Sequence, residues 1–151
     1  MRLEKMKAAK IKAGNYCAYQ ERTQQEVRDK LYNLGLFRDE VEEVLTQLIT
    51  ENFVNEERFA KTYARGKFHL KRWGKLKIMF ELKRRKISPY CVKKAMLEIP
   101  EEEYEKVLDQ LIEQKARDYS GNDYTTKNKI ARYLINKGYE SDLVWKALND
   151  H

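Results

Sequence analysis

The chain has 151 residues, 36% of them charged, with a formal net charge of +7. Its length is enough for one domain or a short array of small units with a buried core. No apolar run approaches the ~20 residues needed to cross a bilayer, and the N-terminal stretch is charged throughout, unlike a secretory signal. We therefore expect a soluble, cytoplasmic protein with no membrane partner.

Apolar residues recur every three or four positions along most of the chain, which predicts helices and no strand. Thr23 and Glu26 form a capping box at one helix start, and Ser88 followed by Pro89 marks another. Gly14 is expected to interrupt the first helix near its end, and residues 120–123 are the plainest loop. The expected helices lie at residues 3–19, 24–34, 39–51, 56–70, 75–86, 89–99, 101–119, 125–137 and 141–149.

One apolar pattern occurs three times along the chain, separated first by 51 and then by 52 residues. A nearly constant spacing of this kind is the signature of a repeat architecture. Each copy has two apolar helix positions, a helix-ending residue, an apolar residue after it, and two further apolar positions. The copies are Val27, Leu31, Gly35, Leu36, Val41 and Leu45; Ile78, Leu82, Lys86, Ile87, Val92 and Met96; and Ile130, Leu134, Gly138, Tyr139, Val144 and Leu148.

The repeat predicts an all-α fold of three tandem three-helix repeats, at residues 1–52, 53–100 and 101–151. A unit of three short helices buries little apolar surface alone, so the units should stack on their neighbours. Because the connecting segments are short, we expect an elongated, curved array.

Charge is distributed unevenly between the three repeats. Residues 58–94 contain fourteen Lys or Arg and one acid, Glu81, a net charge of +13 that leaves −6 on the rest of the chain. Such an excess of one sign points to a polyanion or an acidic partner. The expected binding residues for DNA or a protein–DNA filament are Lys61, Arg65, Lys67, Lys71, Arg72, Lys75, Lys83, Arg84, Arg85 and Lys86.

Aromatic residues are interleaved with these bases. Tyr63, Phe68 and Trp73 could stack on unpaired bases, although core packing is the commoner role of aromatics at helical spacing. The sequence has no phosphate-binding glycine loop, nucleophile elbow or zinc-finger spacing. We expect no catalytic residue, no cofactor and, with two histidines and two distant cysteines, no metal site.

Residues 53–67 and 73–87 together resemble the RecX family of regulators of the RecA recombinase. The family pattern is an apolar residue, acids and Arg-Phe-Ala, then a basic stretch with Gly, then Ile-x-x-Glu-Leu-x-x-Lys-Gly-Ile. Lys86 stands where the family usually has Gly, and Asn55 stands in an acidic stretch. The matching residues are Phe53, Glu56, Arg58, Phe59, Ala60, Gly74, Ile78, Glu81, Leu82, Lys83 or Arg85, and Ile87.

The resemblance implies three tandem three-helix repeats and a non-enzymatic regulator of homologous recombination and DNA repair. Such a protein binds the RecA–DNA filament and contacts single- and double-stranded DNA through phosphates. It modulates filament assembly, ATPase and strand exchange, with inhibition as the expected direction. We expect this chain to be a monomer. The basic segment by itself leaves two alternatives open: a sequence-independent or helix-turn-helix-like DNA-binding module, and a helical scaffold for an acidic protein.

Overall fold

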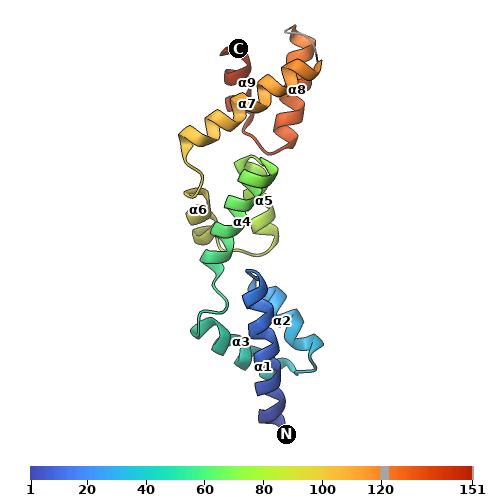
Figure 1. Ribbon diagram of the computed structural model, residues 1–151, viewed down its shortest axis with the longest axis vertical. Coiled ribbons are helices and arrows are strands. Elements are labelled where there is room, and N and C mark those ends of the chain that lie inside the picture. The colour runs from blue at the N-terminus through green and yellow to red at the C-terminus, as the bar shows by residue number, and fades with distance from the viewer. Residues whose placement is uncertain (120–122, 151) are drawn as a thin grey trace. The chain divides into compact units, whose positions relative to one another are not determined.

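A computed structural model describes residues 1–119 and 123–150 (Figure 1), and across them the chain is helical without strands. The predicted all-α class is therefore confirmed. The helices are α1 (Arg2–Tyr19), α2 (Gln24–Asn33), α3 (Arg38–Thr50), α4 (Glu56–Lys71), α5 (Lys75–Arg84), α6 (Pro89–Met96), α7 (Glu101–Tyr119), α8 (Tyr124–Asn136) and α9 (Ser141–Asp150). We call α1–α3, α4–α6 and α7–α9 the first, second and third repeats. Most of the predicted loop at 120–123 lies outside the described residues.

Contacts divide the chain into two compact units, Met1–Thr62 and Tyr63–His151. In the first unit α1, α2 and α3 pack on one another around a single apolar core. In the second unit α5 packs on α6, and α7, α8 and α9 pack on one another. None of the described helices combines the length and the apolar character that a membrane span requires.

Helix α1 runs without a break through Gly14, so the predicted interruption there is wrong. Gly14 is buried, and a Cβ atom at this position would lie 3.5 Å from the Phe53 ring. A glycine inside a helix costs only about 1 kcal/mol relative to alanine, so the surrounding packing can outweigh it. The Phe53 ring thus lies over Gly14, at a distance that would leave an added Cβ in ordinary van der Waals contact.

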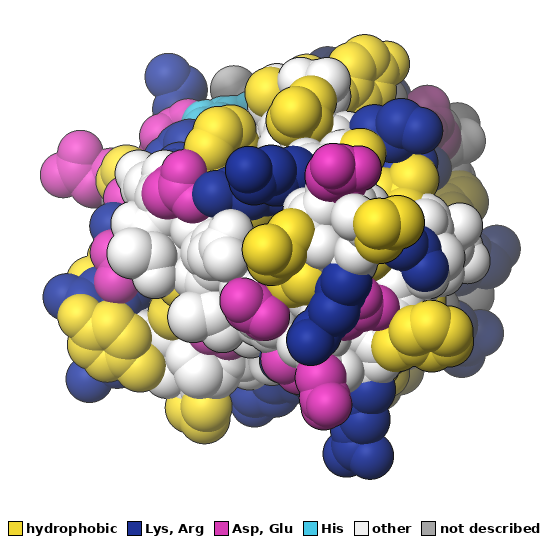
Figure 2. All heavy atoms as spheres, turned by 90° about the horizontal axis from the view of Figure 1, so that it is seen from below, with side chains coloured by type: hydrophobic (Ala, Val, Ile, Leu, Met, Phe, Trp, Pro, Cys, Tyr) yellow, Lys and Arg dark blue, Asp and Glu magenta, His cyan; other side chains and the backbone are white. Residues whose placement is uncertain are grey.

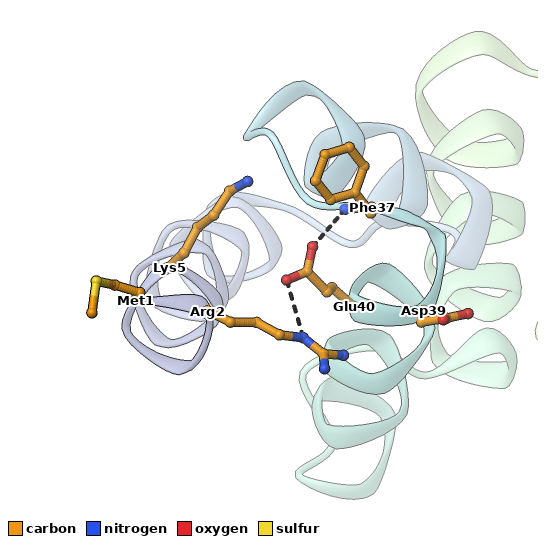
Figure 3. A pocket seen from close by; sticks show the side chains of 6 residues that line it. All are labelled: Met1, Arg2, Lys5, Phe37, Asp39 and Glu40. Atoms are coloured by element: carbon orange, nitrogen blue, oxygen red, sulfur yellow. Dashed lines mark hydrogen bonds and ion pairs between the residues drawn. The ribbon is translucent and has the colours of Figure 1, made fainter.

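The buried carboxylate of Glu40 shows how the first repeat starts α3 (Figure 3). It accepts a hydrogen bond of 2.8 Å from the Phe37 N–H and lies 3.4 Å from Nε of Arg2. Glu40 is only 6% exposed, and buried carboxylates need partners of this kind. The Phe37 ring remains exposed, and the Lys5 ammonium lies 5.0 Å from its centroid.

The three predicted helix ends have the same geometry, which confirms the repeat register. Gly35, Lys86 and Gly138 have φ values of +93°, +62° and +107°. After each, the next amide donates to a carbonyl five residues back, as in a Schellman turn. These bonds are Leu36 N–H to Leu31 O (3.2 Å), Ile87 N–H to Leu82 O (3.1 Å) and Tyr139 N–H to Leu134 O (3.1 Å). Lys86 therefore adopts the left-handed conformation, at a cost of about 1 kcal/mol relative to glycine.

The start of α5 is capped by the third repeat. Gly74, its N-cap residue, has no side chain to accept from the first amides, and such amides need partners. Three successive N–H groups donate instead to atoms of the third repeat: Gly74 to Lys137 O (2.9 Å), Lys75 to Tyr104 Oη (3.0 Å) and Leu76 to Gly138 O (2.9 Å). The second and third repeats are thus joined backbone to backbone.

Two buried tyrosines surround this junction. Tyr104 and Tyr139 are fully buried with ring centroids 5.1 Å apart. The Tyr104 hydroxyl donates to the Glu140 carboxylate, and the Tyr139 hydroxyl donates to the Arg72 carbonyl at 2.9 Å. Burial raises the pKa of both phenols well above the usual 10.

We predict that Gly74→Ala destabilises the second unit by at least about 2 kcal/mol, because an added Cβ would lie 2.2 Å from the Gly138 carbonyl carbon. Gly66→Ala, within α4, is the matched control, since no atom lies within 4 Å of its added Cβ. This control should stabilise the protein by about 0.5–1 kcal/mol through helix propensity. Urea unfolding measures both, and equal effects of the two substitutions would contradict the close backbone contact.

A second prediction concerns alkaline pH. Because both phenols have a higher pKa in the folded than in the unfolded chain, their contribution to stability is intact below pH 10 and is lost as pH rises above it. Tyr104→Phe should be less stable at pH 7 by about 1–3 kcal/mol, since the Lys75 N–H and Glu140 lose a partner. It should also lose less stability than the parent chain between pH 9 and 11. Urea midpoints at pH 7, 9 and 11 test this, and parallel declines would refute it.

Candidate nucleic-acid interface on α4 and α5

The ten predicted binding residues lie on α4, the turn that follows it, α5 and the end of α5. Lys61 belongs to the first unit, and the other nine belong to the second. Being close in sequence does not give them the same role, because their contacts differ. Most are paired with acids, held by aromatic rings, or exposed; Arg85 is both paired and held by a ring, and Arg72 contacts a glutamine.

Five of the ten predicted bases are paired with a carboxylate of the same chain. Pairing consumes charge that would otherwise be available to a polyanion, so the sequence count of +13 overstates the free charge. The pairs are Lys61–Glu57 (2.9 Å), Arg65–Glu98, Lys75–Glu101 (3.0 Å), Arg84–Glu81 (2.8 Å) and Arg85–Glu81 (2.8 Å). Arg72 instead donates to the Gln110 side-chain oxygen at 3.3 Å.

The pairing at Glu81 still leaves an excess of positive charge. Hydrogen bonds from the guanidinium groups of Arg85 and Arg84 lower the pKa of Glu81. One carboxylate thus faces two cations, so the end of α5 keeps a net positive charge. Exposed ion pairs of this kind contribute about 0–1 kcal/mol each, which is little enough for an incoming phosphate to compete for the arginines.

Aromatic rings hold a second group of bases. The ammonium nitrogens of Lys67 and Lys77 lie 4.8 and 4.4 Å from the centroid of the Trp73 ring system. The Arg85 guanidinium lies 4.9 Å from the Tyr63 ring, and Tyr63 meets Trp73 edge-on at 6.5 Å. Cation–π contacts of this type contribute about 0.5–2 kcal/mol each. We call these five residues the aromatic–cation cluster.

The aromatic residues themselves divide between the core and the surface. Phe68 is 1% exposed and lies 5.9 Å from the Tyr104 ring, as expected for a core residue. Tyr63 and Trp73 are only half-buried, and the cations of the cluster lie close to their rings. Burial raises the pKa of Tyr63, so its hydroxyl stays neutral at physiological pH. Core packing is therefore an incomplete account of these two residues.

Lys77 belongs to the cluster but was not among the predicted binding residues. Lys67 lies four positions after Tyr63 on α4, the spacing at which helical side chains meet. Lys77 lies at the same spacing after Trp73, which stands just before α5. An aromatic residue followed by lysine at this spacing was the available signal. Aromatic and basic residues that are considered separately do not reveal it.

Lys71, Lys83 and Lys86 form the exposed group. All three side chains are exposed, and none has a carboxylate partner in the part of the chain that the structure describes. On the surface shown in Figure 2, by contrast, acidic, basic and hydrophobic side chains are interspersed. No group of His, Cys, Asp or Glu suited to holding a metal ion occurs among residues 1–119 and 123–150.

Three family models match successive parts of the chain. They are described as the first, second and third three-helix domains of RecX, and they match residues 9–48, 55–96 and 101–148. These matches agree with helices α1–α3, α4–α6 and α7–α9, and they confirm the prediction of three tandem three-helix domains.

Curated relatives give the same assignment. The chain is 28% identical over 148 residues to the regulatory protein RecX of Bacillus cytotoxicus, and 26% identical over 148 residues to that of Bacillus cereus. Both alignments cover 97% of this chain but 55% of the relative. The chain therefore spans about half the length of the curated relatives that it matches.

Solved structures agree with the fold. The crystal structure of RecX from Lactobacillus salivarius matches with a TM-score of 0.89 and 26% identity, over 98% of this chain and 97% of that one. A second crystal structure of a regulatory protein RecX matches with a TM-score of 0.87 over 99% of this chain and 74% of that one, at 20% identity, and supports the fold alone. Given the three family models in order along the chain, this protein belongs to the RecX family of regulatory proteins.

Proposed function

We propose that this chain regulates homologous recombination by binding the RecA–DNA filament and modulating, in the inhibitory direction, its assembly, ATPase and strand exchange. Membership of the RecX regulatory family carries the proposal. The second repeat supports it, because it holds the unpaired positive charge that a DNA-containing partner requires.

The chemistry of a protein–DNA filament fits the three groups of bases. DNA phosphates would contact the exposed bases Lys71, Lys83 and Lys86 and the aromatic–cation cluster. Contacts of this kind position a protein on a nucleic acid without selecting sequence. Bases paired one to one with an acid, such as Arg65 with Glu98, have their partners within the fold, whereas Arg84 and Arg85 share Glu81 and keep a net positive charge.

In this proposal the chain acts in the cytoplasm as a monomer. It regulates RecA by occupying the filament and not by catalysing a reaction. The three repeats at residues 1–52, 53–100 and 101–151 would contact the filament in succession, with the second repeat as the principal DNA contact. Binding should therefore weaken with salt in proportion to the number of phosphates contacted.

We predict that stoichiometric amounts of the protein reduce the strand exchange and the DNA-dependent ATPase activity of RecA. Replacing Lys83, Arg84 and Arg85 by Ala should weaken this effect by about tenfold or more, because every phosphate that the protein no longer neutralises reduces binding at physiological salt. The matched control replaces Lys7, Lys12 and Arg132, which are exposed and have the same total charge. The control should inhibit like the parent chain.

Three outcomes would contradict this account. If the parent chain leaves both RecA activities unchanged, the regulatory proposal fails. If the triple variant loses helical circular dichroism, these residues are structural and the binding face is misassigned. Equal effects of the triple variant and its control would show that the interaction depends on total net charge and not on this face.

A further inference from the structure

We infer that Lys67 and Lys77, positioned by Trp73, form a binding site for the phosphodiester backbone of a nucleic-acid strand. The inference rests on the proposed function, because it assigns a ligand class to one part of the same face. It differs from the sequence prediction in adding Lys77 and Trp73 and in placing Lys75 and Arg65 outside the site.

The first observation is that the two ammonium groups converge on one ring. Lys67 comes from α4 and Lys77 from α5, and both lie within 5 Å of the centroid of the Trp73 ring system. Both lysines and Trp73 are half-buried, so their motion is restricted while part of each side chain stays accessible. Two cations held this near to the same ring raise the positive potential around it, which favours an anion there.

The second observation concerns what neutralises each base. An aromatic ring orients an ammonium group but carries no opposing charge, whereas a carboxylate cancels it. Across the described residues Lys67 and Lys77 contact rings and no carboxylate, whereas Arg65 contacts Glu98. Lys75 lies 4.5 Å from the Tyr104 ring centroid but also contacts Glu101. Among the described residues, the positive charge of Lys67 and Lys77 is therefore not offset by a carboxylate.

The third observation is that the backbone around Trp73 is held from both sides. The Trp73 N–H donates to the Lys67 carbonyl at 3.1 Å. Its neighbours are bound by the third repeat, since the Arg72 carbonyl accepts from Tyr139 Oη and the Gly74 N–H donates to Lys137 O. Arg72 also has a left-handed φ of +57°, which the surrounding contacts maintain. Trp73 is thus a positioning residue for the two lysines.

A nucleic-acid strand fits this site better than an acidic peptide does. Lysine is a common binder of phosphate, where it acts as a point charge. Beside the lysines lie the partly exposed rings of Trp73 and Tyr63, on which a base or sugar adjoining the phosphate can pack. An acidic peptide would satisfy the lysines but would place no base on these rings.

The test measures fluorescence anisotropy of labelled oligothymidylate with the full chain, without RecA, across a salt series. The double variant Lys67→Gln/Lys77→Gln should bind about tenfold more weakly. Its slope of log K against log salt should fall by about 1.4, because each phosphate neutralised on a single strand contributes about 0.7. Lys7→Gln/Lys12→Gln removes the same charge from exposed positions on α1 and should change neither value.

The positioning role of Trp73 has its own variants. Trp73→Leu keeps every charge but removes the ring, so affinity should fall several-fold with the salt slope largely retained. Trp73→Phe keeps an aromatic face and should restore most of that affinity. Circular dichroism and urea unfolding of each variant establish that the fold is intact.

Three results would overturn the inference. One is an unchanged affinity and salt slope in the double lysine variant. Another is a Trp73→Phe variant as weak as Trp73→Leu, which would show that the ring acts only by filling space. The third is an equal loss of affinity for polyglutamate and for oligothymidylate, which would assign the site to anions in general. Because RecA is absent, a failure here leaves the regulatory proposal intact, and inactivity toward RecA leaves this site intact.

Discussion

The capping of α5 by the third repeat is the contact on which the second unit depends. A helix that begins at glycine has no side chain to satisfy its first amides, so those amides need acceptors from elsewhere. Lys137 O, Tyr104 Oη and Gly138 O supply them. The absence of a Cβ at Gly74 and Gly138 permits this approach. One constraint thus fixes the start of α5, the turn before it and the packing of the third repeat against both.

The basic residues of the second unit have two kinds of contact. The acids near the start of α7 pair with bases of α4 and α5, as in Arg65 with Glu98 and Lys75 with Glu101. His69 Nδ1 lies 3.4 Å from a Glu103 carboxylate oxygen in the same region. Among the described residues, the bases that no carboxylate offsets are those held by rings alone or left exposed. Docking of the third repeat therefore offsets the charge of Lys75 through Glu101, whereas Arg65 is paired with Glu98 inside the second repeat.

Much of the fold could be predicted from sequence because it depends on local patterns. Val27, Ile78 and Ile130 occupy equivalent buried positions, and the Thr23–Glu26 capping box forms as expected. Gly35 and Gly138 end their helices in the left-handed conformation, and so does Lys86. Met96 is only half-buried, although its counterparts Leu45 and Leu148 are core residues. Periodicity gives the face of a helix but not how fully a neighbour covers it.

The candidate site was harder to predict because charge in a sequence does not show which charges are paired. Arg65, Lys75 and Arg84 looked equivalent to Lys83, yet each has an acidic partner that the fold brings near. Likewise, nothing in the sequence around Gly74 indicates that the start of α5 is capped by a distant part of the chain.

The central claim, that the third repeat holds the turn carrying Trp73, is tested most directly by native-state hydrogen exchange at the amides of Gly74 and Leu76. Exchange should be slow and should require unfolding of the second unit, because both amides donate to the third repeat. Exchange at the rate of an exposed turn would show that this contact does not persist in solution, and the account would be wrong.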